Sequence, residues 1–284
     1  MLEEMNQTTN LVKQVIRRKG GFKKDGSTHH SGIKNEHNIV EFLNTPESII
    51  GQHLRPTPDH IVSHKGGTQT KADAVVINKL SAQEEFTLSI KNHKTGTFDW
   101  LNSTKGLPED IQNSLKERTK EIKQAYAEHQ NIETARTEVD TMFSTALDSL
   151  KTNHSFLTEV IYTIFNKYTD GIIVNHEKKG EIIYFERKEL KELQVFRDYT
   201  YYLKHNNGTC SAQIMRRKNS DSEEINTNLR LRLVLNNGVN ALVGTSSKNK
   251  TSVPCLKIQQ DGVDDFINKI ENKIIEKIII KIYN

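Results

Sequence analysis

The 284-residue sequence contains only two cysteines, Cys210 and Cys255, which stand singly and without the spacing of metal ligands. This scarcity argues against a disulfide framework and against a cysteine-based zinc site. Long apolar runs are missing too. No window approaches the ~20 consecutive apolar residues of a membrane-spanning helix, and the N-terminus lacks the apolar core of a signal peptide. We therefore expect an intracellular, cytoplasmic protein with reduced thiols and no place in a membrane.

A strong excess of either charge is also absent. Forty Lys plus Arg against 36 Asp plus Glu give a formal charge of +4 and a pI near 8.8. This is short of the pI above ~9 that marks a strongly basic nucleic-acid binder. Basic residues do gather near the N-terminus, at Lys13, Arg17, Arg18, Lys19, Lys23 and Lys24. A basic arm over residues 1–31 could bind phosphate, or it could simply be solvated and flexible.

The remaining composition, 35% hydrophobic and 27% charged, is that of a globular protein, and we expect one core with elaborations. Apolar periodicity predicts a helix over about 33–43 and helical segments between 108 and 168. Strands are predicted at about 72–77, 86–91, 199–203, 211–215 and 229–235, with a hairpin around 178–180. These elements favour an α/β fold with a central mixed β-sheet flanked by helices.

The last 22 residues, 263–284, place isoleucines at helical intervals with lysines and acids opposite. This pattern predicts a C-terminal amphipathic helix that packs on the core. A membrane-surface helix is the weaker alternative, because Asp264, Asp265, Glu271 and Glu276 dilute its basic face.

A candidate catalytic group lies on two neighbouring predicted strands. In the strand 86–91, Ser89 and Lys91 share one face, and Ile90 points to the other. If the preceding strand brings Asp73 against that face, a carboxylate, a hydroxyl and an ammonium converge at the end of a sheet. Carboxylate and backbone oxygens are the ligands that Mg²⁺ prefers, and a lysine can orient an attacking water or offset transition-state charge. The group therefore suits phosphodiester hydrolysis.

Glu36 lies three and four residues before Ile39 and Val40, so its carboxylate falls on the apolar stripe of the helix predicted over 33–43. An acid on an apolar stripe needs a specific reason, and one such reason is a structural ion pair.

The segment GGTQTKADAVV (66–76), followed by LSIKNHK (88–94), resembles the active-site hairpin of the PD-(D/E)xK nucleases, the superfamily of most type II restriction endonucleases. Within it, the likeness is to the MspI-like enzymes. The resemblance implies a restriction-endonuclease-like domain over 32–262, a catalytic hairpin over 66–94 and Mg²⁺ as cofactor. It assigns metal binding to Asp73 and catalysis to Lys91, and it makes Glu36 similar to a catalytic helix glutamate that many such nucleases point at the metal site. The Ser89 hydroxyl, directly or through water, and the Ile90 carbonyl could supply the further metal ligands. Ser89 departs from the pattern, because most members carry a second acid there.

The same resemblance extends to the DNA contacts. QIMRRKNSDSEE followed by LRLRLVLN is similar to a DNA-contacting strand pair of related endonucleases, here over about 199–235. It nominates Arg216, Arg217, Lys218, Arg230 and Arg232 as DNA contacts. Asn92, His93 and Lys94 follow the catalytic triplet and could reach the scissile phosphate, with His93 either a second proton carrier or incidental. Phe98 and Trp100 either pack beneath the site or, for an exposed Trp, stack on a base.

The expected function is therefore Mg²⁺-dependent, sequence-specific cleavage of double-stranded DNA by a monomer or homodimer. A structure-specific repair or nicking nuclease could use the same hairpin. A DNA-binding protein with a decayed site is the other alternative, which the serine at position 89 keeps open.

Overall fold

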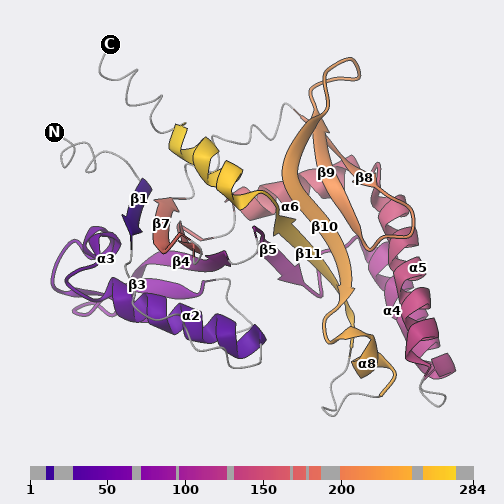
Figure 1. Ribbon diagram of the computed structural model, residues 1–284, viewed down its shortest axis with the longest axis horizontal. Coiled ribbons are helices and arrows are strands. Elements are labelled where there is room, and N and C mark those ends of the chain that lie inside the picture. Colours follow the sequence, from indigo (N-terminus) through magenta and orange to yellow (C-terminus); the bar gives the residue numbers. More distant parts are fainter. Residues whose placement is uncertain are drawn as a thin grey trace. The chain divides into compact units, whose positions relative to one another are not determined.

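The computed structural model describes residues 11–15, 28–65, 72–93, 96–126, 131–166, 169–176, 179–186, 199–244 and 252–272. They belong to two compact units, and Figure 1 shows the elements of both. The first unit contains Met1–Phe98, Phe165–Val195 and Gly262–Asn284, and the second contains Asp99–Ile164 and Phe196–Asp261. The chain therefore leaves the first unit twice to build the second.

The protein is α/β with helices flanking its sheets, as expected, but its described residues form two sheets where the sequence predicted a single central one. The two stretches that form the second unit carry enough amphipathic strands and helices to enclose a core of their own. The DNA-contact strands expected over 199–235 consequently belong to a different unit from the hairpin with Asp73.

The first unit contains a mixed six-stranded sheet in the order β1-β7-β6-β4-β3-β2. Of its neighbouring strands, β4 and β6 are parallel and the others are antiparallel. Two parallel strands need a long crossover connection. Here the connection between β4 and β6 contains the first stretch of the second unit, Asp99–Ile164. The elements are β1 (Leu11–Val15), α2 (Thr28–Leu43), α3 (Ile49–Leu54), β2 (His60–His64), β3 (Ala74–Asn78), β4 (Gln83–His93), β6 (Gly171–His176), β7 (Glu181–Glu186) and a helix over 263–272.

Helices cover both faces of this sheet. On one face, Ile39 and Leu43 of α2 belong to a buried cluster with Leu88 and Ile90 of β4. On the other face, Phe266 of the helix 263–272 packs edge-on against Phe185 of β7, with ring centroids 6.1 Å apart. From Phe86 onward, the alternation of side chains along β4 therefore directs even-numbered residues toward α2 and odd-numbered ones to the opposite face.

Gly171 marks the tightest point of the sheet. It begins β6 beside β4, and a Cβ there would lie 2.7 Å from a ring carbon of Tyr184 and 2.8 Å from one of Phe86. Only glycine fits without moving these rings.

The second unit contains a five-stranded sheet in the order β5-β11-β10-β9-β8, in which β8 to β11 pair antiparallel. Along β10, buried Leu229, Leu231 and Leu233 alternate with partly exposed Arg230 and Arg232. The elements are β5 (Phe98–Ser103), α4 (Glu109–Tyr126), α5 (Ile132–Leu150), α6 (His154–Asn166), β8 (Thr200–His205), β9 (Ser211–Arg217), β10 (Ile225–Leu235), α8 (Gly238–Leu242) and β11 (Pro254–Gln260).

The predicted strands at 72–77 and 86–91 are confirmed as the antiparallel pair β3 and β4, and the strands of the hairpin expected around residues 178–180 are confirmed as β6 and β7. The predicted helices correspond to α2, α4, α5 and α6, and the three later strands to β8, β9 and β10. Within the arm expected over 1–31, residues 11–15 form β1 against β7 and 28–31 begin α2, while the rest lies outside the described residues. Of the C-terminal helix expected over 263–284, the structure describes 263–272, with Val263, Phe266, Ile267 and Ile270 buried.

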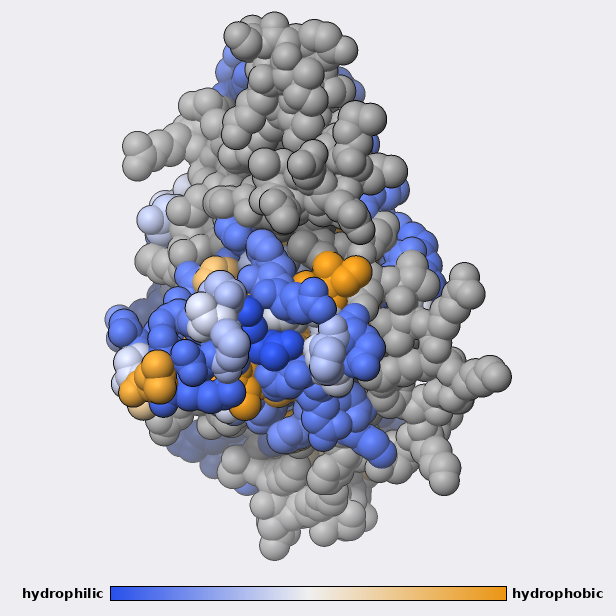
Figure 2. All heavy atoms as spheres, turned by 90° about the vertical axis from the view of Figure 1, so that its left-hand side faces the viewer, coloured by the Kyte–Doolittle hydropathy of each residue, from blue (hydrophilic) through white to orange (hydrophobic). Residues whose placement is uncertain are grey.

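Within the described ranges, the chain has no helix of the length and apolarity needed to cross a membrane. Figure 2 views the side on which α2 and α3 are drawn in Figure 1, and its described atoms are mostly hydrophilic, with apolar side chains in small separate groups. Scattered apolar residues of this kind are normal on a protein surface.

Candidate functional site

Asp73 lies directly before β3, opposite Ser89 of β4. Its Oδ2 accepts a hydrogen bond of 2.9 Å from the Ser89 hydroxyl and one of 2.7 Å from the Ile90 backbone N–H. The backbone N–H of Asp73 donates to the Leu88 carbonyl at 2.8 Å. The carboxylate is therefore held by two hydrogen bonds at the point where β3 begins, and the structure brings Asp73, Ser89 and Ile90 together as the sequence predicted.

The roles of Ser89 and Ile90 follow from this geometry. Ser89 is completely buried, and its hydroxyl donates to Asp73, so in this structure it orients the carboxylate. A strand residue directs its N–H and C=O to the same neighbour. Because the N–H of Ile90 points to Asp73, its carbonyl faces that side of β4 as well. An aspartate and a carbonyl oxygen are thus the metal donors that this corner offers most directly.

Lys91 is partly exposed and pairs in register with Val174 of β6. By strand alternation it shares the face of β4 on which Ser89 contacts Asp73. The predicted grouping of Asp73, Ser89 and Lys91 on one face is consistent with the structure.

Glu36 lies on α2, the helix that covers the opposite face of the sheet. Its Oε2 is 3.0 Å from Nε2 of His64, whose ring stacks on His37 with centroids 4.0 Å apart. His64 pairs with Ala74, the neighbour of Asp73, so Glu36 stands at the same end of the sheet. Of the two roles considered for Glu36, the contact with His64 supports the structural one.

The strand end beyond Lys91 differs from the expectation. His93, expected to reach DNA, is 2% exposed, because β6 and the helix 263–272 enclose it. Asn92 falls on the α2 side by alternation and is partly exposed. Lys94 and the glycine pair at 66–67 lie outside the described residues.

His93 instead joins a cluster that the sequence interpretation missed. Its ring lies edge-on to that of His176, with centroids 4.3 Å apart, and its Nε2 is 3.8 Å from Oδ2 of Asp264. Nε2 of His176 lies 2.8 Å from Oδ1 of Asp264. One signal was present: the buried strands IKNH and IVNH end in the same Asn-His dipeptide at 92–93 and 175–176.

Asp264 is charged at neutral pH. Hydrogen bonds from Lys179 and, second, from His176 hold the pKa of this carboxyl well below its usual range, against the smaller opposing effect of burial. The Lys179 ammonium lies 2.7 Å from Oδ1, and the aspartate side chain remains 51% exposed. The cluster therefore opens outward on the side of the carboxylate.

In the second unit, the nominated arginines do not form one continuous row. The Arg216 guanidinium lies 4.5 Å from the ring centroid of Tyr199, and that of Arg217 lies 5.3 Å from the ring of Tyr202. Neighbouring strand residues point to opposite faces, which separates the two side chains. Lys218 is exposed, 6.0 Å from the Tyr199 ring.

The arginines of β10 share a face. Arg230 pairs with Asp261 at 2.8 Å, and Arg232 is partly exposed beside Lys257 of β11 in the sheet register. Trp100 is buried, as favoured from the sequence, but it packs within the second unit and not beneath the Asp73 corner: it is 1% exposed and donates from Nε1 to Gln260 at 3.0 Å.

Neither cysteine forms a disulfide. Burial, followed by the hydrogen bond to Asp140, raises the pKa of the Cys210 thiol to about 12. Burial also raises the pKa of Cys255. Both thiols are therefore protonated at neutral pH, and they do not behave as activated nucleophiles.

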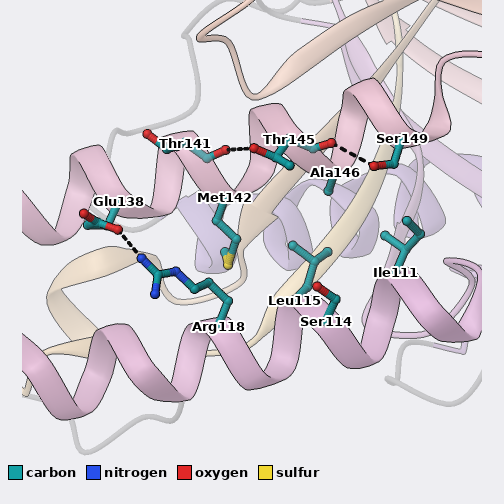
Figure 3. Close-up of a pocket in the computed structure, with 10 residues that line it drawn as sticks. All are labelled: Ile111, Ser114, Leu115, Arg118, Glu138, Thr141, Met142, Thr145, Ala146 and Ser149. Atoms are coloured by element: carbon teal, nitrogen blue, oxygen red, sulfur yellow. Dashed lines mark hydrogen bonds and ion pairs between the residues drawn. The ribbon is translucent and has the colours of Figure 1, made fainter.

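A groove of about 280 Å³ lies between α4 and α5 (Figure 3). Its polar rim is already engaged: Arg118 pairs with Glu138, and Thr145 and Ser149 donate to backbone carbonyls one turn earlier in α5. These contacts stabilise the helix pair and indicate no chemistry.

Comparison with protein-family models, curated proteins and solved structures finds no match to this chain.

Proposed function

We propose that the protein is a Mg²⁺-dependent endonuclease that cleaves double-stranded DNA at specific sequences, as its resemblance to the PD-(D/E)xK nucleases implies. The observation that carries the proposal is the Asp73 carboxylate, held at the start of β3 by Ser89 and Ile90. Carboxylates that bind metals are typically oriented by hydrogen bonds of this kind.

The donor set at this corner fits magnesium. Proteins usually hold Mg²⁺ through one or two carboxylates, with waters and substrate phosphates completing the shell. Asp73 and the Ile90 carbonyl would be the protein ligands, and Ser89 would keep the carboxylate in place. The ion would supply an activated water and neutralise charge on the scissile phosphate.

Lys91 would add a positive charge from a protein side chain to that of the metal ion. From the same face as Ser89, its ammonium could orient the attacking water or stabilise the charge that develops on the phosphate. On the second unit, Arg230 and Arg232 share a partly exposed strand face and are the best supported of the nominated DNA contacts. Arginine can bind phosphate or read a guanine edge.

The test is cleavage of long unmethylated duplex DNA by the full-length protein with Mg²⁺, beside Asp73→Asn and a chelator control. Asp59→Asn is the matched control, since Asp59 is a partly exposed aspartate of the same unit. We expect discrete fragments from the unmodified protein and from Asp59→Asn. The rate should fall at least about a thousandfold in Asp73→Asn, which corresponds to about 4 kcal/mol of transition-state stabilisation.

The other outcomes separate the rival functions. Cleavage confined to nicked or branched DNA would identify a structure-specific nuclease. DNA binding without cleavage would indicate a DNA-binding protein whose catalytic site has decayed. Equal cleavage by Asp73→Asn would remove Asp73 from the active site.

A further inference from the structure

We infer that His93, His176 and Asp264 form a binding site for one transition-metal ion of the Zn²⁺ class, separate from the corner at Asp73. The inference does not rest on the proposed nuclease activity. It rests on three side chains from β4, β6 and the helix 263–272, which meet inside the first unit.

The fold itself brings the two histidines together. β4 and β6 are parallel and in register, so His93 and His176, the last residues of their strands, are direct partners on the same face of the sheet. Asp264, near the start of the helix 263–272, approaches from that face. The helix is held there by the bond from Val263 N to Gly96 O and by the packing of Phe266 on Phe98 and Phe185.

The distances suit one small ion if the ligand atoms move closer together. The ligand atoms of the three residues all lie within 4.8 Å of one another. Around tetrahedral zinc, with bonds of about 2.0–2.1 Å, neighbouring ligand atoms are roughly 3.4 Å apart. The most distant pair of ligand atoms must therefore approach by up to roughly 1.4 Å when the ion binds, and one coordination position remains for water.

The donor types decide the class of ion. Two of the three ligands are imidazole nitrogens, which suit Zn²⁺ and related transition metals, whereas Mg²⁺ and Ca²⁺ take oxygen ligands. Both histidines are only 2% exposed, so the surrounding strands and the helix 263–272 restrict the positions of their rings.

Two contacts compete with the ion. The Lys179 ammonium occupies Oδ1 of Asp264, and the Lys179 backbone N–H donates to Nδ1 of His176 at 3.3 Å. Coordination through Nε2 would move the His176 proton to Nδ1 and give up the second contact. Removing the lysine ammonium should therefore raise the affinity for the metal ion, whereas removing a ligand should lower it.

The test is titration of the chelator-treated full-length protein with Zn²⁺ alone, in competition with a chromophoric chelator, and with Co²⁺ as a spectroscopic probe. We expect one ion per chain, the visible absorption of tetrahedral Co²⁺, and a higher Tm with zinc. His176→Gln and Asp264→Asn should each weaken binding by more than the roughly 10- to 100-fold typical of outer-shell partners. Lys179→Ala should tighten it severalfold.

Two controls separate a metal site from a structural cluster. His205→Ala removes a buried histidine that pairs with Asp148 at 2.9 Å in the second unit, and it should keep the zinc stoichiometry. Asp73→Asn should also keep it, so failure of the nuclease proposal leaves this result unaffected. Asp264 is half-exposed, and Asp264→Asn is expected to fold even if His176→Gln does not. Zinc binding below one ion per chain, or unchanged in Asp264→Asn, would overturn the inference.

Discussion

The two sheets carry their polar residues in different ways. In the antiparallel sheet of the second unit, β10 alternates buried leucines with partly exposed arginines, which is the ordinary pattern of a half-buried strand. In the mixed sheet of the first unit, β4 buries Ser89 and His93 almost completely, and β6 buries His176. Polar groups inside a sheet require partners, and here those partners are the side chains of candidate sites.

This difference indicates which of the two sheets is the better candidate to carry an active site. An exposed arginine on β10 needs no special reason to be there, because the water-facing side of such a strand is normally polar. A fully buried serine that orients a carboxylate is harder to explain by solvation alone. In the proposed nuclease, the reaction would therefore belong to the first unit and DNA contact to the second.

Replacing Lys91 is the sharpest way to break this division of roles. If Lys91 stabilises the attacking water or the transition state, Lys91→Ala should lower the single-turnover cleavage rate by about a thousandfold while DNA affinity changes little. Lys120→Ala, an exposed lysine of α4 in the second unit, is the control. Lys91→Arg should recover little activity, because the two cations differ in shape and hydration. A proportional loss of DNA affinity in Lys91→Ala would instead assign this lysine to binding.

Gly171 tests whether the two units are stable independently. The Cβ of Gly171→Ala would meet the rings of Tyr184 and Phe86, and overpacking of this kind costs about 1–3 kcal/mol. Trp100 is the only tryptophan and lies in the second unit, so its fluorescence reports that unit, while far-UV circular dichroism reports both. In urea, the circular dichroism should show earlier unfolding and the tryptophan midpoint should stay unchanged.

Gly32→Ala is the matched control for Gly171→Ala. A Cβ at Gly32, inside α2, has no heavy atom within 4 Å, so this change should stabilise the protein by about 0.5–1 kcal/mol through helix propensity. A joint shift of both probes in Gly171→Ala would show that the units unfold as one.

The sequence predicted the elements whose pattern is local. β4 alternates over Phe86, Leu88 and Ile90, and α2 repeats its apolar residues at helical spacing, so both could be recognised without tertiary information. β1, which falls within the arm expected over 1–31, was not recognised, and neither were β2, β5 and β11. HIVSH is half polar, FDWLNS alternates weakly, and PCLKIQQ begins with a proline, which lowers the strand signal in each case.

The two candidate sites also differ in whether local sequence determines them. Asp73 and Ser89 meet across a hairpin, and their contact follows from a short connection. His93 and His176 meet across a parallel pair whose strands are separated in sequence by the first stretch of the second unit, Asp99–Ile164, and no local pattern determines that pairing. The third ligand comes from a helix still further along the chain, so the cluster was visible only as a repeated Asn-His ending.

The smallest expected effect concerns the DNA-contact role of the second unit. Arg232→Ala should weaken binding of duplex DNA by roughly 3- to 10-fold, with full catalytic rate on saturating DNA. If Arg232 contacts phosphate, the slope of log affinity against log salt should fall by about one, equally for every sequence. If it reads a guanine, the loss should be confined to the cognate site. Arg136→Ala is the control, since Arg136 is an exposed arginine of α5 that pairs with Glu133 at 3.0 Å. Equal affinities for the two variants would remove this face of β10 from the DNA interface and leave binding to the first unit.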